Sequence, residues 1–135
     1  MIKNDLNYNK NDELELLKIQ ERINNLPKHD FGIYPVKESG NADDIKEFTG
    51  RIIITAPGHI FENVGLTLTV HFSDKFGETG EYDINIEKSY YPKDREGEIR
   101  KRESELVQLI SDIIGLHLAR CFYNVILTAK DKNIT

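Results

Sequence analysis

The fold of this chain is decided by residues 105–127, which read ELVQLISDIIGLHLARCFYNVIL. Apolar side chains recur in this stretch at steps of three and four residues, and that spacing predicts a helix. The apolar positions cover well over half of the helix circumference. A helix of this kind is normally covered on more than one side. We therefore expect the chain's own sheet on one side of it and a second surface on another.

Two stretches upstream predict a pair of antiparallel strands. Residues 66–72 alternate apolar and polar side chains, and residues 82–86 do the same. The stretch DKFGETG at 74–80 contains two glycines and is typical of a hairpin loop. We expect one face of this strand pair to be buried and the other to be open to solvent.

The register of the hairpin follows from keeping both apolar faces together, with Phe72 opposite Tyr82. The polar face then forms cross-strand pairs. These pairs are Thr67 with Glu87, Thr69 with Asn85 and His71 with Asp83.

The remaining elements are a helix and two shorter strands. Asp12 followed by Glu15 is a capping-box pattern, and it predicts a first helix that ends at Pro27 and buries Leu14, Leu17, Ile19, Ile23 and Leu26 on one side. Residues 31–36 predict either a short edge strand or no strand at all, because Pro35 lacks a backbone donor. Residues 37–47 predict a polar loop, and residues 51–56 another strand. Residues 1–10 and 130–135 are expected to be loose tails.

The predicted order is therefore helix, three to four antiparallel strands, helix, within one domain spanning residues 1–135. This is an α+β layer with the long C-terminal helix packed on one sheet face, and both helices can cover that face. The same order occurs in unrelated families, so topology alone does not indicate a function.

Composition narrows the class of function. The net charge is −5, and an acidic surface repels phosphate backbones, so nucleic acid is an unlikely partner and a basic protein surface a better one. The single cysteine, Cys121, excludes a disulfide within the chain. The first residues lack the apolar core of a signal peptide, and Asp112, His117 and Arg120 argue against a membrane span. We expect a cytoplasmic protein.

No motif in the sequence fixes a chemistry. The signatures of phosphate loops, nucleophile elbows, zinc proteases and dinucleotide sites are absent, so the chain is interpreted as a binding protein in preference to an enzyme. The four histidines, at 29, 59, 71 and 117, lack the spacing of a zinc site. We expect neither a metal nor a cofactor.

Residues 88–102, KSYYPKDREGEIRKR, are the one place where the charge inverts, with six basic and three acidic residues. Guanidinium groups beside aromatic rings can clamp a nucleotide, a phosphate or an acidic partner. The candidate ligand-binding residues are Tyr90, Tyr91, Arg95, Arg100 and Arg102. The alternative is a solvated run of charges at a helix start.

Two further surfaces are candidates for contact. The polar sheet face, with Thr69, His71, Asp83 and Asn85, is either an exposed set of cross-strand pairs or a binding surface. A polar seam on the long helix comprises His117, Arg120 and Asn124 and is more typical of an interface or a solvent-facing position than of a catalytic site.

Three small residues mark a possible self-contact. Ser111, Gly115 and Ala119 fall at four-residue steps on the long helix, where missing side-chain bulk lets a second helix approach. Gly115 costs a helix about 1 kcal/mol relative to alanine, which favours a packing role. We expect a homodimer or higher oligomer through this stripe, unless the first helix covers the same surface.

The leading hypothesis is a small acidic cytoplasmic protein that acts by occupying a protein partner, as inhibitor, immunity or adaptor proteins do. The composition would suit a phage or mobile-element source. The runner-up is a homo-oligomer that binds a small anionic ligand such as a nucleotide. A hydrolase that lacks a known motif is the third.

Overall fold

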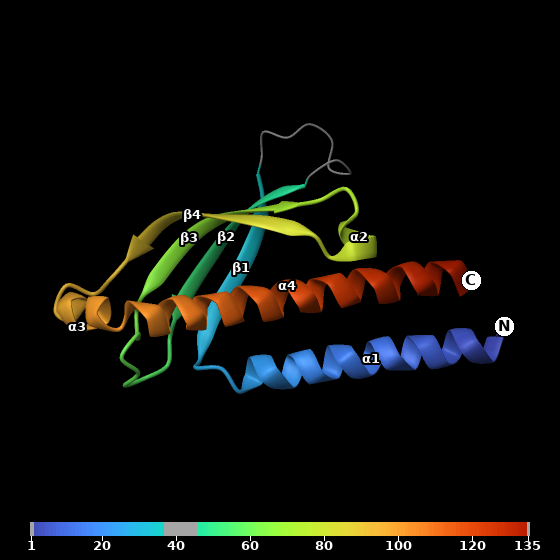
Figure 1. Ribbon diagram of the computed structural model, residues 1–135, viewed down its shortest axis with the longest axis horizontal. Helices are drawn as coiled ribbons and strands as arrows, with labels where there is room; N and C mark the ends of the chain where they lie inside the picture. The colour runs from blue at the N-terminus through green and yellow to red at the C-terminus, as the bar shows by residue number, and fades with distance from the viewer. Residues whose placement is uncertain (1, 37–45, 135) are drawn as a thin grey trace.

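Figure 1 shows the computed structural model, which describes residues 2–36 and 46–134, with side chains for residues 11–36 and 46–128. It confirms the predicted α+β fold. In chain order the elements are α1 (Ile2–Asn24), β1 (His29–Pro35), β2 (Glu47–Ile54), β3 (Gly65–Phe72), α2 (Phe76–Thr79), β4 (Tyr82–Tyr90), α3 (Glu96–Lys101) and α4 (Glu103–Ile134). The polar loop predicted at 37–47 lies outside the described residues, except that residue 46 precedes β2 and residue 47 begins it.

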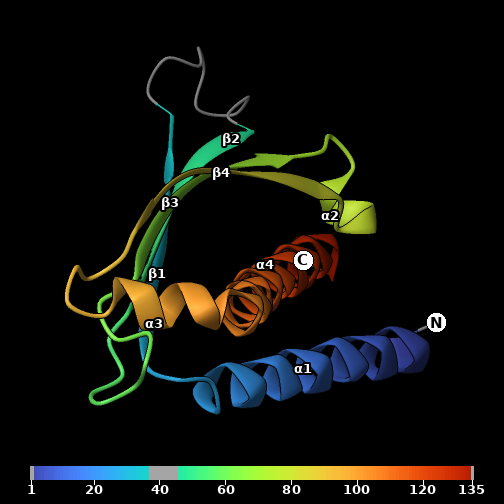
Figure 2. The same cartoon turned by 60° about the vertical axis from the view of Figure 1, so that its left-hand side comes forward.

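The four strands form one antiparallel sheet in the order β1-β2-β3-β4. The two ends of this order, β1 and β4, are the sheet edges, which confirms the edge position predicted for the proline-bearing strand. In both views α4 lies between the sheet and α1 (Figures 1 and 2). The first helix therefore covers α4 and not the sheet face, so the expectation that both helices cover the sheet is wrong.

The main core lies between α4 and the two central strands. From the strands it contains Ile52, Ile54, Leu66, Leu68 and Val70, and from α4 it contains Leu106, Ile110, Ile113, Ile114 and Leu118. Along β3 the buried side chains alternate with more exposed ones, as predicted. Apolar burial of this kind is the main stabilising contribution to a fold of this size.

A second, smaller cluster joins α1 to the other side of α4. Ile19 and Ile23 of α1 pack on Leu116 of α4, with Ala119 beside them. This is the second surface that the long apolar helix requires, and it comes from the same chain. Leu14 and Leu17, predicted to lie on the buried side of α1, are instead 53% and 66% exposed.

The start of α1 differs from the prediction. The helix begins at Ile2, so Asp12 is not its N-cap but a buried residue in its interior. Residues 2–10 and 130–134, expected to be loose, have helical backbones. The N-cap prediction is wrong because a capping-box pattern also occurs in helix interiors, where the preceding residues continue the helix.

Other boundaries shift by a few residues. β2 spans Glu47–Ile54 in place of the predicted residues 51–56. The hairpin loop contains the short helix α2, which ends at Thr79 and is capped by Gly80 with a positive φ of 71°. The last helical region is split at Arg102, whose φ of −116° separates α3 from α4.

The register of β3 with β4 is as predicted up to Asn85 and then changes. Phe72 lies opposite Tyr82, His71 opposite Asp83 and Thr69 opposite Asn85. A bulge then leaves Glu87 without an opposite residue and places Lys88 opposite Thr67. The predicted pair of Thr67 with Glu87 is therefore wrong by one residue.

By length and composition alone, residues 103–128 of α4 would suffice to cross a membrane. The core helix of a globular protein satisfies the same criterion, and here α4 packs on the sheet and on α1. Within this window 28% is buried, so the expectation that the chain does not span a membrane stays a prediction.

Candidate functional site

An apolar groove of about 430 Å³ lies between the edge strand β4 and the helix α4. Its size is in the range of ligand pockets in proteins. Both walls are built mainly from apolar side chains. The lining residues are Leu66, Tyr82, Ile84, Ile86, Ser89 and Tyr91 on the sheet side, and Glu103, Leu106, Val107, Ile110, Ser111, Ile114 and Gly115 on α4.

The exposure of β4 makes this groove unusual. Ile84 and Ile86 lie opposite Val70 and Leu68, which are fully buried, and so share the core-facing side of the sheet. They are nevertheless 36% and 54% exposed, because α4 crosses the central strands and leaves β4 uncovered. The expectation that the apolar face of the strand pair is buried is therefore wrong for β4. On the helix wall Val107 is 59% exposed. Two rows of apolar side chains thus face an open groove.

The predicted self-contact stripe is divided between two surroundings. Ala119 packs beside the cluster that joins α1 to α4. Ser111 and Gly115 line the groove instead. A Cβ atom on Gly115 would meet nothing within 4 Å, so the packing inside this chain does not require a glycine there.

The basic cluster at 88–102 does not form one guanidinium site. Arg95 donates to the backbone carbonyls of His59, Ile60 and Glu62, so it fastens the loop after β2. Arg100 pairs with Glu96 at 2.8 Å, and Arg102 pairs with Glu105 at 2.6 Å. Each guanidinium group therefore has a separate partner.

The two tyrosines of that cluster also separate. Tyr91 lines the groove and lies under the Arg100 guanidinium, with 5.3 Å between the Arg100 Cζ atom and the ring centroid. Burial raises the pKa of the Tyr91 hydroxyl, and the nearby Glu103 carboxylate adds to that rise. Tyr90 is half-exposed beside Lys88.

The polar sheet face is assembled as predicted, with one addition. Thr69 and Asn85 both donate to the Glu87 carboxylate, at 2.8 and 3.1 Å. Asp83 makes no hydrogen bond or ion pair with any side chain that the structure describes. The outer face of β4 therefore carries the negative charges of Asp83 and Glu87 and, beyond the bulge, the positive charge of Lys88.

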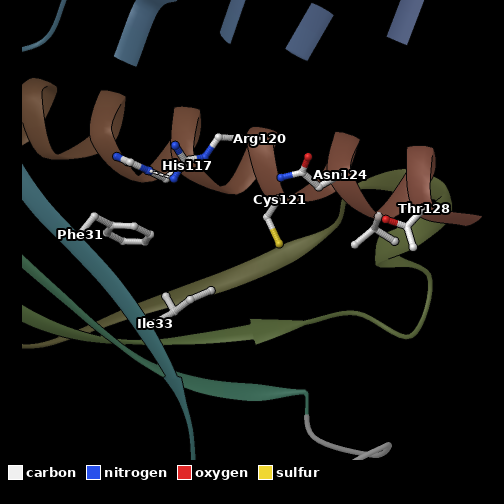
Figure 3. A pocket seen from close by; sticks show the side chains of 8 residues that line it. Phe31, Ile33, His117, Arg120, Cys121, Asn124 and Thr128 are labelled. Carbon is white, nitrogen blue, oxygen red and sulfur yellow. Dashed lines mark hydrogen bonds between the residues drawn. The ribbon is translucent and has the colours of Figure 1, made fainter. Parts of the chain in front are cut away.

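A second hollow, of about 580 Å³, lies between α4 and the other edge strand, β1. Figure 3 shows the Phe31 and Ile33 side chains of β1 below α4, with the Cys121 sulfur directed into the space between them. The predicted polar seam of the long helix lines this hollow. The residues are Phe31, Ile33, His117, Arg120, Cys121, Asn124, Val125 and Thr128.

A chain of hydrogen bonds joins His117 and Arg120, which line this pocket, to residues outside it. The His29 Nδ1 atom lies 2.7 Å from the Pro27 carbonyl oxygen, which can only accept, so this nitrogen donates. His29 Nε2 then accepts from His117 Nε2 at 2.9 Å, and His117 Nδ1 accepts from Arg120 at 2.9 Å. Arg120 also donates to the Gln20 side chain of α1 at 3.0 Å.

This network keeps His117 neutral. Burial lowers its pKa from 6.5 to about 4, and the positive Arg120 guanidinium and His29 act in the same direction. The Phe31 ring stacks on the imidazole with centroids 4.8 Å apart. Burial also raises the pKa of the Cys121 thiol, so this thiol is protonated at neutral pH.

Sequence reasoning missed several residues of both hollows. Ile84 and Ile86 are exposed because β4 is an edge strand. That edge position could have been predicted, because the last strand of a meander lies at the edge of its sheet. The contact of His29 with His117 joins positions 88 residues apart, and no local pattern signals it. In the part of the chain with described side chains, no group of three or more His, Cys, Asp or Glu side chains is arranged to hold a metal ion.

Comparisons with protein-family models, curated proteins and solved structures find no match to this chain.

Proposed function

We propose that this chain is a binding protein that holds an extended segment of a partner protein against β4, in the groove between β4 and α4. The observation that supports it is the pair of exposed isoleucines, Ile84 and Ile86, on the core-facing side of an edge strand. Within the described residues no strand pairs with the outer edge of β4.

Strand addition suits this geometry. An edge strand presents unpaired backbone N–H and C=O groups, which an extended peptide can satisfy, while alternate side chains of the peptide enter a neighbouring groove. The bulge at Glu87 interrupts the regular edge, so the usable part of β4 is Tyr82–Ile86. Side chains at every second peptide position would face the apolar groove.

The charges around the groove indicate what the other side chains should be. Asp83 and Glu87 lie on the outer face of β4, with Lys88 beyond the bulge, and the whole chain carries a net charge of −5. Opposite charges across neighbouring strands are favourable. The partner segment is therefore expected to alternate apolar and basic residues.

This proposal keeps the sequence-based hypothesis of an acidic cytoplasmic protein that acts by occupying a partner. It adds that the partner presents an extended segment of alternating apolar and basic residues. A second copy of this chain is the alternative occupant, because Ser111 and Gly115 also line the groove. An isolated edge with exposed apolar side chains is an aggregation hazard unless something covers it.

The test uses an end-blocked peptide of sequence Lys-Val-Lys-Val-Lys-Val-Lys and a control of the same composition, Lys-Lys-Val-Val-Val-Lys-Lys. Binding is measured by titration, and the site is located by amide hydrogen exchange. The alternating peptide should bind more tightly and should slow exchange within residues 82–86. Equal binding of both peptides, or protection elsewhere, contradicts strand addition.

A matched pair of variants separates the groove from the rest of the sheet. Ile86→Lys places a charge at the groove, whereas Ile53→Lys places one at a 40% exposed position on the opposite sheet face. Both should fold, since both side chains are already solvent-accessible. Only Ile86→Lys should weaken binding of the alternating peptide, and an equal loss in both variants would show that the attraction is a general charge effect.

A further inference from the structure

We infer that the pocket between β1 and α4 is a separate binding site for a small amphiphilic carboxylate, with Arg120 at the carboxylate and the apolar wall around the rest of the ligand. The pocket lies at the β1 edge, whereas the peptide groove lies at the β4 edge. The inference is therefore independent of the proposed function.

The first observation that supports a carboxylate site is the charge of Arg120. Its guanidinium is part-buried, and its two hydrogen-bond partners, the Gln20 amide and the His117 ring, are both neutral. Among the described side chains no carboxylate forms an ion pair with it, although Arg100 and Arg102 each have one. A part-buried charge is favourable only when it is paired or well hydrogen-bonded.

The second observation is that Arg120 and Asn124 have N–H donors without a partner among the described side chains. A guanidinium group has five N–H donors, and Gln20 and His117 take one each. One turn further along α4, the Asn124 amide makes no hydrogen bond within the part of the chain with described side chains. Figure 3 shows Arg120 and Asn124 on successive turns of the helix above the pocket. Together they provide donors suited to a carboxylate.

The third observation is the apolar wall of the pocket. Phe31 and Ile33 from β1 face Cys121 from α4 across the hollow (Figure 3). Val125 of α4 also lines it. The Cys121 thiol is neutral and acts here as a small apolar group. A volume of about 580 Å³ with one polar end is typical of a site for a small organic ligand.

The neutrality of His117 narrows the ligand class. Because His117 is uncharged at neutral pH, Arg120 is the only cation that lines the pocket among the described residues. One positive charge suits a monoanion with an apolar body and does not suit a multiply charged phosphate. We therefore expect octanoate to bind and inorganic phosphate to bind far more weakly.

The experiment uses the full chain and its single cysteine. Cys121 lies on the pocket wall, so a bound ligand should shield it from alkylation by iodoacetamide. The rate of alkylation is measured with octanoate, with octan-1-ol and with inorganic phosphate at equal concentrations. Octanoate should slow the reaction, octan-1-ol should bind about tenfold more weakly because it lacks the charge-assisted hydrogen bond, and phosphate should have no effect.

Variants then assign the carboxylate contact. Arg120→Met should reduce octanoate affinity about tenfold and leave octan-1-ol unchanged, whereas Arg100→Met, at an exposed and paired arginine, should change neither. Arg120→Lys keeps the charge and guards against a folding defect in the methionine variant, and it should retain most of the octanoate affinity.

Several outcomes overturn the inference. They are protection by octan-1-ol or phosphate that equals protection by octanoate, octanoate protection that survives in Arg120→Met, and no protection by any of the three compounds. The comparison of the three compounds needs no variant, so it tests whether the pocket binds an amphiphilic carboxylate even if Arg120→Met does not fold.

Discussion

His29 and His117 share a hydrogen bond between their Nε2 atoms, which lie 2.9 Å apart. The Pro27 carbonyl fixes His29 as the acceptor in this bond, and Arg120 fixes His117 as the donor. The bond ties the start of β1 to the middle of α4, and Gln20 extends the connection to α1. Two imidazoles in this arrangement cannot both be protonated, because the bond needs one free lone pair.

The first prediction concerns acid stability. In the unfolded chain His117 titrates near 6.5, whereas in the folded chain its pKa is about 4. Between these values the unfolded chain binds more protons, so stability is complete above about pH 6.5 and falls as the pH drops toward about 4. The loss should be about 1–2 kcal/mol after allowance for the solvent exposure of this half-buried ring.

Chemical denaturation of the wild type and of His117→Gln at a series of pH values measures this loss. The glutamine amide can donate to His29 and accept from Arg120 but does not titrate, so the variant should lose less stability in acid. Parallel pH profiles for the two proteins would show that His117 does not contribute to the acid sensitivity.

The second prediction concerns the buried face of β3. Leu68 is fully buried between the sheet and α4, so Leu68→Asp should unfold the protein, since an unpaired buried carboxylate costs several kcal/mol. Thr69→Asp, one residue along, lies on the open face and should cost about 1 kcal/mol, because a second carboxylate replaces the hydrogen bond to Glu87. Circular dichroism thermal melts compare the two, and equal losses would contradict the assigned faces.

The third prediction tests the bulge in β4. Arg51 lies opposite Thr67 on β2, so the test is made in an Arg51→Met background. With Lys88 opposite Thr67 on β4, Thr67→Asp then creates one opposite-charge pair and should change stability by less than about 0.5 kcal/mol, or raise it slightly. If Glu87 lay opposite Thr67, the same variant would place two carboxylates side by side and lower the stability. Adding salt separates the two cases, since screening weakens an attraction and relieves a repulsion.

The successes and failures of the sequence analysis have physical causes. The faces of β3 were predictable because alternation along a strand is a local pattern. The bulge at Glu87 was not, because one inserted residue shifts the register without changing the apolar pattern before it. The exposure of Ile86 depends on which strands α4 crosses, and that is decided by packing across the whole chain.

The candidate sites were predictable to a smaller extent. The polar seam of His117, Arg120 and Asn124 was visible as a set of helix neighbours, but its contact with His29 is long-range. The structural role of Arg95 in holding the loop at residues 59–62 could not be predicted from the sequence, because its partners are backbone carbonyls, which any residue carries. Charge clustering in the sequence indicated an anion site there, and that site stays a prediction. The contacts themselves are a loop held by Arg95 and two exposed ion pairs.

The fourth prediction follows from Arg95. Its guanidinium satisfies backbone carbonyls of the loop at residues 59–62, so Arg95→Met should cost about 2–3 kcal/mol by leaving these acceptors unpaired. Arg102→Met removes only an exposed ion pair within α4 and its preceding turn, and should change stability by about 0.5 kcal/mol or less. Urea denaturation measures both, and equal effects would refute a structural role for Arg95.

The last prediction concerns Gly115, at the floor of the groove between β4 and α4. A Cβ atom there meets nothing within 4 Å, so Gly115→Ala should raise the stability by about 1 kcal/mol through helix propensity alone. A fall in melting temperature would mean that the space above Gly115 is filled in solution. Gly115→Leu tests which molecule fills this space. The leucine side chain should block the groove to a peptide or to a second copy, while the buried core remains intact.

Light scattering separates these two occupants. If a partner segment is the natural occupant, the wild type and Gly115→Leu should both have a mass of 15.6 kDa, and only the variant should fail to bind the alternating peptide. A wild type of twice that mass that Gly115→Leu reduces to 15.6 kDa would assign the groove to a second copy of the chain. The close approach of two α4 helices past Ser111 and Gly115 would then replace strand addition as the explanation of the exposed β4 edge.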